Sequence, residues 1–263
     1  GLGRLFQRKK APAEQGEQAL GISSDEFGDC WALMREIRGL MLRGKDQQSE
    51  WEVVCDKPKT KIWRREAASV DANDRGSSGG VLVGGAGKGS LGYVYRAAAF
   101  FDDPLDLVFG AITNVGNRME WDKTCREMRR IRSSGLQCPD TDVIYWRVSF
   151  PYPLADRDYV YYRRLHNDEG GGHRFMISRG AERGMHVGLV PGVVRVDRFE
   201  TRLALEEDRE NRGVQYFIEY YEEPKGNIPA WAVNFAMDKA VDAMVEGMRR
   251  QIQTLKQQIN RQG

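Results

Sequence analysis

The feature that most constrains the fold is a series of short β-patterned segments that fills much of the second half of the chain. The segments alternate in hydropathy, and brief connections rich in glycine, proline and aspartate separate them. They are TCREMRRIR, DVIYWRVSF, RDYVYYRRL, GHRFMISRG, VVRVDRFETRLAL and VQYFIEYY, between Thr124 and Tyr221. Because parallel strands need long crossovers, these short connections predict an antiparallel meander.

A long amphipathic helix is predicted after the last strand, from about Ile228 onward. Apolar residues recur there at steps of three and four, namely Met237, Val241, Met244, Val245, Met248, Ile252, Leu255 and Ile259. About thirty helical residues at roughly 1.5 Å each span about 45 Å, which is longer than a small domain is wide. A curved antiparallel sheet wrapped around this helix is the economical α+β arrangement.

The domain boundaries follow from composition. Residues 1–20 mix glycine, glutamine, proline and charge without periodicity, which predicts a disordered lead-in. Glycine and serine dominate residues 71–90, which predicts a flexible loop between two strands. Residues 21–260, which include this loop, are expected to form a single domain.

Two further helices are predicted before the meander. Ser23 and Glu26 have the spacing of a capping box, and Gly44 can end the helix that they open. Asp103 and Pro104 predict an N-cap followed by a proline at the first helical position.

Composition excludes several classes of function. A hydrophobic fraction of 41% and a charged fraction of 30% are typical of a globular protein, and a net charge of +2 does not indicate a nucleic-acid partner. The four cysteines form no CxxC pair, so neither a metal site nor a disulfide framework is expected, and a reducing compartment is favoured. No apolar run is long enough for a transmembrane helix. The protein is therefore expected in the cytoplasm, peripheral at membranes, or in a mitochondrion or plastid if the basic opening GLGRLFQRKK is the remnant of a leader.

Motifs for nucleotide binding and for nucleophilic catalysis are incomplete. GGAGKGS resembles a phosphate-binding loop, but Leu82 stands where the first glycine belongs and Gly89 follows Lys88. There is no G-x-S-x-G motif. No catalytic residue, metal or cofactor is therefore expected, and the chain is not expected to be an enzyme.

The hairpin that contains Pro151 and Pro153 is crowded with aromatic residues. Strand alternation places Trp146 on an apolar face, and it gives Tyr159 the same face as Arg157. From periodicity alone, two interpretations stay open. The rings either belong to an ordinary core packed on the final helix, or they line a ligand cavity.

The string YWRVSFPYPLADRDYVYYRR resembles a signature of the START family, the lipid-transfer domains related to the steroidogenic acute regulatory protein. NRMEWDK at 117–123 and EEPKGNIPAWAVNF at 222–235 match the same family in order and spacing, over roughly residues 24–258. The resemblance implies a helix-grip fold, in which a nine-stranded antiparallel sheet surrounds a lipid tunnel and the C-terminal helix forms a lid.

Within that family, the chain is most similar to the branch that transfers phosphatidylcholine. The resemblance implies a cage of aromatic rings around the choline ammonium, formed here by Trp146, Tyr159, Phe199 and Tyr220. A tyrosine is expected at Phe199, so one hydroxyl is lost there. The ring faces would stabilise a quaternary ammonium through cation–π interactions.

The resemblance also implies a phosphate site and a lid. Arg118 would contact the lipid phosphate with Asp122 as its charge partner, and Thr201 stands in the headgroup site where a glutamine is expected. The predicted lining of the lid and the acyl chains is Trp231, Met237, Val241, Met244 and Met248. For these methionines, ordinary helix packing is an equally good interpretation.

The expected function is binding and transfer of one phospholipid, phosphatidylcholine above others, with transient contact to a membrane surface. Arg249, Arg250, Lys256 and Arg261 could touch anionic headgroups during exchange. Two alternatives remain: a binder or sensor of a sterol or ceramide, and an enzyme of the thioesterase or cyclase type. The oligomeric state is left open.

Overall fold

The computed structural model describes most of the chain between residues 22 and 262. The described residues are 22–43, 49–67, 93–131, 141–181, 187–223, 225 and 230–262, with backbone alone for 230–242 and 262. The predicted lead-in at 1–20 and the predicted loop at 71–90 lie outside them, as does Gly44.

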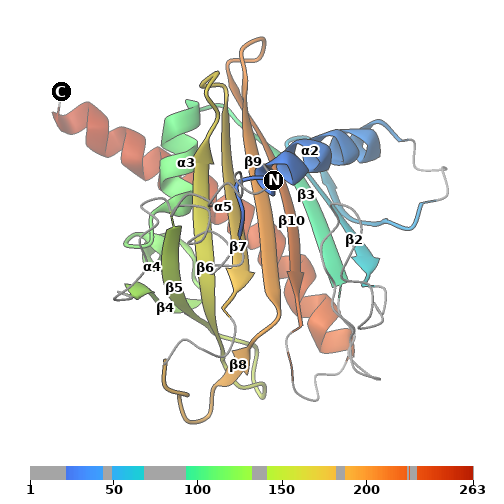
Figure 1. Ribbon diagram of the computed structural model, residues 1–263, viewed down its shortest axis with the longest axis vertical. Helices are drawn as coiled ribbons and strands as arrows, with labels where there is room; N and C mark the ends of the chain where they lie inside the picture. The colour runs from blue at the N-terminus through green and yellow to red at the C-terminus, as the bar shows by residue number, and fades with distance from the viewer. Residues whose placement is uncertain are drawn as a thin grey trace, which may run out of the picture.

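One curved, predominantly antiparallel sheet forms the centre of the fold (Figure 1). Its strands are β1 (Glu52–Lys57), β2 (Thr60–Glu66), β3 (Tyr93–Phe101), β4 (Cys125–Ile131), β5 (Thr141–Val148), β6 (Arg157–Asn167), β7 (His173–Gly180), β8 (Val194–Val196), β9 (Phe199–Asp208) and β10 (Gly213–Glu222). The order across the sheet is β1-β2-β3-β10-β9-β7-β6-β5-β4, and β8 pairs with β6 outside this path. The predicted meander is confirmed, because β4, β5 and β6 are each antiparallel to the next strand, and β7–β9 and β9–β10 are antiparallel as well.

The helices are α2 (Phe27–Leu42), α3 (Leu105–Thr113), α4 (Arg118–Trp121) and α5 (Ala230–Gln262). Figure 1 shows α5 crossing behind the sheet while α2 lies on the near side. The two packing clusters agree with this view, because Tyr216 of β10 packs with α5 whereas Phe217 packs with α2. We call the face toward α5 the inner face and the face toward α2 the outer face.

The amphipathic stripe of α5 is largely confirmed where its side chains are described. Val245, Met248 and Ile252 are buried against the inner face, and Leu255 is partly buried there. Ile259 is exposed, so the stripe does not bury the last turns of the helix. The basic, glutamine-rich end of α5 therefore extends past the sheet, as its predicted length requires.

Two local predictions are wrong. The segment 193–205 forms two strands, because the chain breaks between β8 and β9 so that β8 can run parallel to β6. Asp103 is not an N-cap: Pro104 occupies that position, and the buried Asp103 carboxylate accepts a hydrogen bond from Lys256 Nζ at 2.6 Å. Asp103 thus ties the start of α3 to α5.

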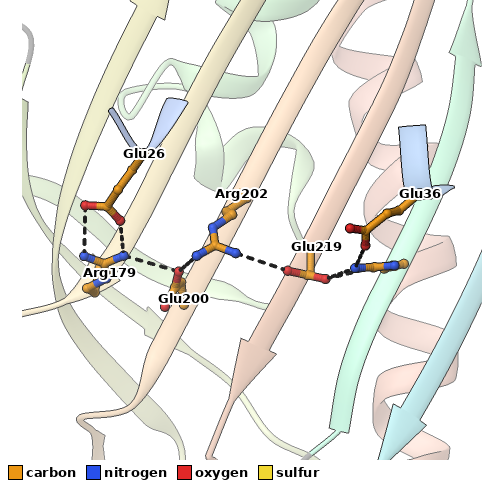
Figure 2. A network of polar contacts seen from close by, with 7 residues as sticks. Glu26, Glu36, Arg179, Glu200, Arg202 and Glu219 are labelled. Atoms are coloured by element: carbon orange, nitrogen blue, oxygen red, sulfur yellow. Dashed lines mark hydrogen bonds and ion pairs between the residues drawn. The ribbon is translucent and has the colours of Figure 1, made fainter. Parts of the chain in front are cut away.

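A row of alternating charges crosses the outer face beneath α2 (Figure 2). On the sheet, the row consists of Arg179, Glu200, Arg202, Glu219 and Arg96, from β7, β9, β10 and β3. Glu26 pairs with Arg179 at one end of the row, and Glu36 of α2 pairs with Arg96 at 2.6 Å at the other. These ion pairs fasten α2 across four strands.

Candidate ligand site

Four aromatic side chains that the sequence assigned to a cage lie together on the inner face. Trp146 and Tyr159 are register partners in β5 and β6, with ring centroids 4.9 Å apart. Phe199 of β9 lies 5.5 Å from Tyr159, and Tyr220 of β10 lies 5.6 Å from Phe199. The structure therefore brings together rings that are up to 74 residues apart, from Trp146 to Tyr220 in the sequence. Tyr161 extends the cluster, with its ring 5.0 Å from Phe199.

Strand alternation explains why these rings share one face. In β9, Phe199 and Thr201 point inward, whereas Glu200 and Arg202 join the outer charge row. Thr201 is the register partner of Tyr220 in β10 and is buried beside it. Thr201, which the resemblance assigns to the headgroup site, therefore lies beside the ring cluster.

The buried carboxylate of Glu222 lies against two of the cage residues. Its Oε2 accepts hydrogen bonds from the Tyr159 hydroxyl at 2.6 Å and from the Tyr220 hydroxyl at 2.5 Å. Burial raises the pKa of Glu222 above its ordinary value of 4.5, although both tyrosine hydroxyls and Arg157 act in the opposite direction. Burial and the carboxylate together raise the pKa of each tyrosine well above 10. At neutral pH both phenols therefore stay protonated and donate hydrogen bonds to Glu222.

Sequence reasoning missed Glu222, although a signal was available. It follows Tyr220 by two residues in a strand, and the period of two places both side chains on the same face. A carboxylate on an otherwise apolar face is uncommon and indicates a specific partner.

Arg118 and Asp122 form the predicted pair at the edge of the ring cluster. Arg118 Nε and Asp122 Oδ2 are 2.7 Å apart, and Thr124 donates its backbone N–H and its hydroxyl to Asp122 Oδ1. Burial alone would raise the pKa of Asp122, but Arg118 and Thr124 outweigh it and lower that pKa below 3.8. Asp122 is therefore ionised at neutral pH and fixes the guanidinium.

The Arg118 guanidinium lies over two indole rings. Its Cζ is 4.3 Å from the ring centroid of Trp121 and 5.4 Å from that of Trp146. Because Trp146 also stacks on Tyr159, the arginine and the ring cluster share a side chain. The Arg118–Asp122 pair and the ring cluster therefore meet at Trp146.

Buried polar atoms near Arg118 have no hydrogen-bond partner in the described part of the chain. They include the Tyr216 hydroxyl and the indole N–H group of Trp121. Burial raises the pKa of Tyr216, which keeps its hydroxyl protonated. Buried polar groups in native proteins almost always have a partner, so these atoms are available to a hydrogen-bonding ligand or to water.

The predicted lid residues are only partly described. Met248 is buried and Met244 partly buried in the inner cluster, whereas the side chains of Trp231, Met237 and Val241 lie outside the described residues. Near Met248, α5 passes very close to α4. A Cβ added at Gly247 would lie 2.9 Å from Cε3 of Trp121 and 3.0 Å from its carbonyl oxygen.

An antiparallel sheet that grips a long C-terminal helix defines the helix-grip class of α+β folds, as expected. The family described as "START domain" matches residues 34–261. The chain belongs to the START domain family, whose members are lipid-transfer proteins.

Curated relatives carry lipid-transfer names. The chain is 31% identical to the phosphatidylcholine transfer protein of Homo sapiens over 163 residues, covering 61% of this chain and 73% of the relative. It is 25% identical over 207 residues to "StAR-related lipid transfer protein 7, mitochondrial" of Mus musculus, covering 78% of this chain and 49% of that relative.

Solved structures support the same fold. Human StAR-related lipid transfer protein 5 superposes with a TM-score of 0.64 at 13% identity, covering 89% of this chain and 99% of that one. Human STARD10 superposes with a TM-score of 0.61 at 13% identity, covering 86% of this chain and 81% of that one. Within the described residues, no helix combines the length and the apolar character that crossing a membrane requires.

Proposed function

We propose that this protein extracts one phosphatidylcholine molecule from a membrane, shields it between the inner face and α5, and delivers it to another membrane. The observation that carries the proposal is the gathering of Trp146, Tyr159, Phe199 and Tyr220 beside the Arg118–Asp122 pair. Relatives named for phosphatidylcholine transfer support the choice of lipid.

The headgroup chemistry matches these side chains. A trimethylammonium has no N–H to donate, so ring faces have to replace its water, at up to about 2 kcal/mol per desolvated contact. Centroid separations of 4.9 Å between Trp146 and Tyr159 and 5.5 Å between Tyr159 and Phe199 leave the rings in mutual contact. Entry of an ammonium therefore requires these side chains to separate.

Arg118 suits the phosphate because its orientation is already fixed. Asp122 holds Nε, and the guanidinium lies over the rings of Trp121 and Trp146. The outer nitrogens can then meet phosphate oxygens without losing further side-chain freedom.

The acyl chains require a dry interior and a lid that opens. About thirty methylenes at roughly 0.8 kcal/mol each favour the bilayer strongly, so the protein has to bury them as well as the bilayer does. Met244 and Met248 of α5 can adapt to chains of different shape. We assign the lid role to α5, because the helix crosses behind the sheet (Figure 1) and its residues from Met244 to Leu255 pack against the inner face.

Not all of the cations expected to touch the membrane are available for it. Lys256 binds Asp103, and Arg249 binds Glu246, the Lys59 carbonyl and the Thr60 hydroxyl. Arg250 and Arg261 are exposed, and we assign the membrane contact of α5 to them.

Native mass spectrometry and extraction from phosphatidylcholine vesicles test the proposal. Wild-type protein should carry one phospholipid, and Trp146→Ala with Tyr159→Ala should lose both the bound lipid and the extraction. Tyr152→Ala is the matched control, because Tyr152 is 97% exposed in the same hairpin and should retain its lipid. Undiminished extraction by a folded double variant would refute the cage.

A sterol or ceramide remains the second candidate ligand, because Phe199 and Thr201 replace a tyrosine and a glutamine expected in a choline site. Lipidomics on the purified protein separates the two, since a sterol would leave Arg118 without a phosphate to bind. The proposal includes no enzymatic step; turnover of an acyl-CoA thioester would add one. We propose that it acts at membrane surfaces of the cytoplasm, or of an organelle like the relative named as mitochondrial.

A further inference from the structure

We propose that the Glu222 carboxylate is the counter-charge of the ligand's ammonium, and that it makes this site select lipids whose headgroup carries an ammonium. The inference rests on the proposed function and deepens it. Glu222 is not one of the four aromatic cage residues, and its charge predicts which lipids the site does not bind.

The geometry leaves half of the carboxylate available. Both tyrosine hydroxyls donate to Oε2, so Tyr159 and Tyr220 hold the carboxylate from two strands, and no described residue donates to Oε1. Glu222 is 6% exposed, and its register partner in β9 is Phe199 of the cage. The carboxylate therefore lies within the ring cluster and away from solvent.

Nearby cations of the described chain are engaged elsewhere. The Arg157 guanidinium donates to the carbonyls of Ala155 at 2.5 Å and Lys225 at 3.1 Å, and lies 4.3 Å over the Phe150 ring. The Lys225 ammonium pairs with Asp197. No ion pair is seen for Glu222 among the described residues, and the nearby charge of Arg157 acts to lower its pKa.

A buried carboxylate without an ion pair is costly, and a bound ammonium would reduce that cost. The two tyrosines add to the effect. A phenol that donates a hydrogen bond to an anion becomes more electron-rich, so its ring attracts a cation more strongly. One carboxylate thus strengthens two ring faces as well as supplying its own charge.

The expected consequence is selectivity for lipids that carry an ammonium group. Lipids with a choline headgroup, such as phosphatidylcholine and sphingomyelin, pair with Glu222. A sterol or a diacylglycerol leaves the carboxylate buried without a partner, and an anionic headgroup adds a second negative charge. The site should therefore discriminate by the presence of an ammonium in the headgroup rather than by acyl chain.

Glu222→Gln tests the counter-charge with little change of shape. The amide oxygen still accepts from both tyrosines, so the rings keep their support while the charge is lost. Phosphatidylcholine affinity, measured by transfer from vesicles of 1-palmitoyl-2-oleoyl-phosphatidylcholine, should fall about tenfold or more, as when one partner of a close charge pair is removed. Uptake of the uncharged diacylglycerol with the same chains should hold or rise.

Glu223→Gln is the matched control. Glu223 is the next residue, points to the opposite side of the chain and pairs with Arg198 at 3.4 Å. Removing its charge changes the net charge of the protein as much as Glu222→Gln does. Its phosphatidylcholine affinity should stay at the wild-type level.

The pH dependence of the wild type provides a second readout. Protonation of Glu222 removes the counter-charge, so choline-lipid affinity should fall as the pH is lowered through the raised pKa of Glu222, and the profile of Glu222→Gln should be flatter. Of the groups that face this carboxylate, Tyr159 and Tyr220 stay protonated, Arg157 stays charged and Phe199 does not titrate. This readout needs no folded variant.

The outcomes distinguish the two proposals. If Glu222→Gln binds phosphatidylcholine like the wild type, or if the wild-type affinity does not change as the pH is lowered through the pKa of Glu222, the counter-charge is overturned. Loss of lipid in the Trp146→Ala, Tyr159→Ala variant would still support the transfer function. If the wild type extracts no phosphatidylcholine, the proposed function itself fails.

Discussion

The contact between α4 and α5 yields a prediction whose sign depends on one close approach. Gly247→Ala in an exposed helix would stabilise the protein by about 1 kcal/mol, because alanine has the higher helix propensity. Here the new methyl group would lie 2.9 Å from the Trp121 ring and 3.0 Å from its backbone oxygen. Neither a ring held under the Arg118 guanidinium nor a carbonyl can rotate away, so α5 has to shift. Overpacking of this kind costs about 1–3 kcal/mol. We expect the overpacking to win, with a net loss of up to about 2 kcal/mol.

Gly39→Ala provides the control, because it also lies within a helix but has no atom within 4 Å of the added methyl group. Urea denaturation should show Gly39→Ala more stable and Gly247→Ala less stable than the wild type. Lipid exchange should also become faster in Gly247→Ala, since α5 is held less closely. A gain of stability in both variants would refute the close approach of Gly247 to Trp121.

Two further predictions concern the charged pairs. Arg202→Met should lower the free energy of unfolding by about 3 kcal/mol in urea denaturation, because the buried carboxylates of Glu200 and Glu219 each lose one ion-pair partner. An unchanged denaturation midpoint would mean that the outer row contributes little net stability. The pKa of Asp122 is lowered in the folded state, so its stabilising effect should be fully present above about pH 4 and lost as the pH falls through the folded pKa. Denaturation of wild type and Asp122→Asn should therefore differ most at pH 7 and least at pH 2, and a constant difference would argue against the shift.

Elements with a strong local pattern were predictable. The alternation in β5, β6 and β10 gave the right faces, because each of these strands buries apolar residues on the inner side. The break between β8 and β9 was not predictable, since no glycine or proline interrupts the segment from Val194 to Phe199. Pairing of Val194 with Arg157 of a distant strand determines that break.

The site was predictable only in part, for the same reason. The family resemblance located the four cage rings, Arg118 and Asp122, and the structure brings these side chains together. Their roles toward a lipid remain proposals. Contacts between distant segments had no signal in the sequence. Lys256 engages Asp103 across 153 positions, and Gly247 looks like an ordinary helical glycine until Trp121 is placed against it.

The outer charge row and the inner ring cluster are two consequences of one strand register. In β9 and β10, Thr201 is opposite Tyr220 on the inner face, and Arg202 is opposite Glu219 on the outer face. A slip by one residue in either strand would send the charged side chains into the apolar interior and the rings to the outside. Buried ion pairs contribute little net stability over apolar side chains, but they penalise such a slip heavily. We therefore attribute to the outer row the specification of register, which is what places the rings and Glu222 on the same side of the sheet.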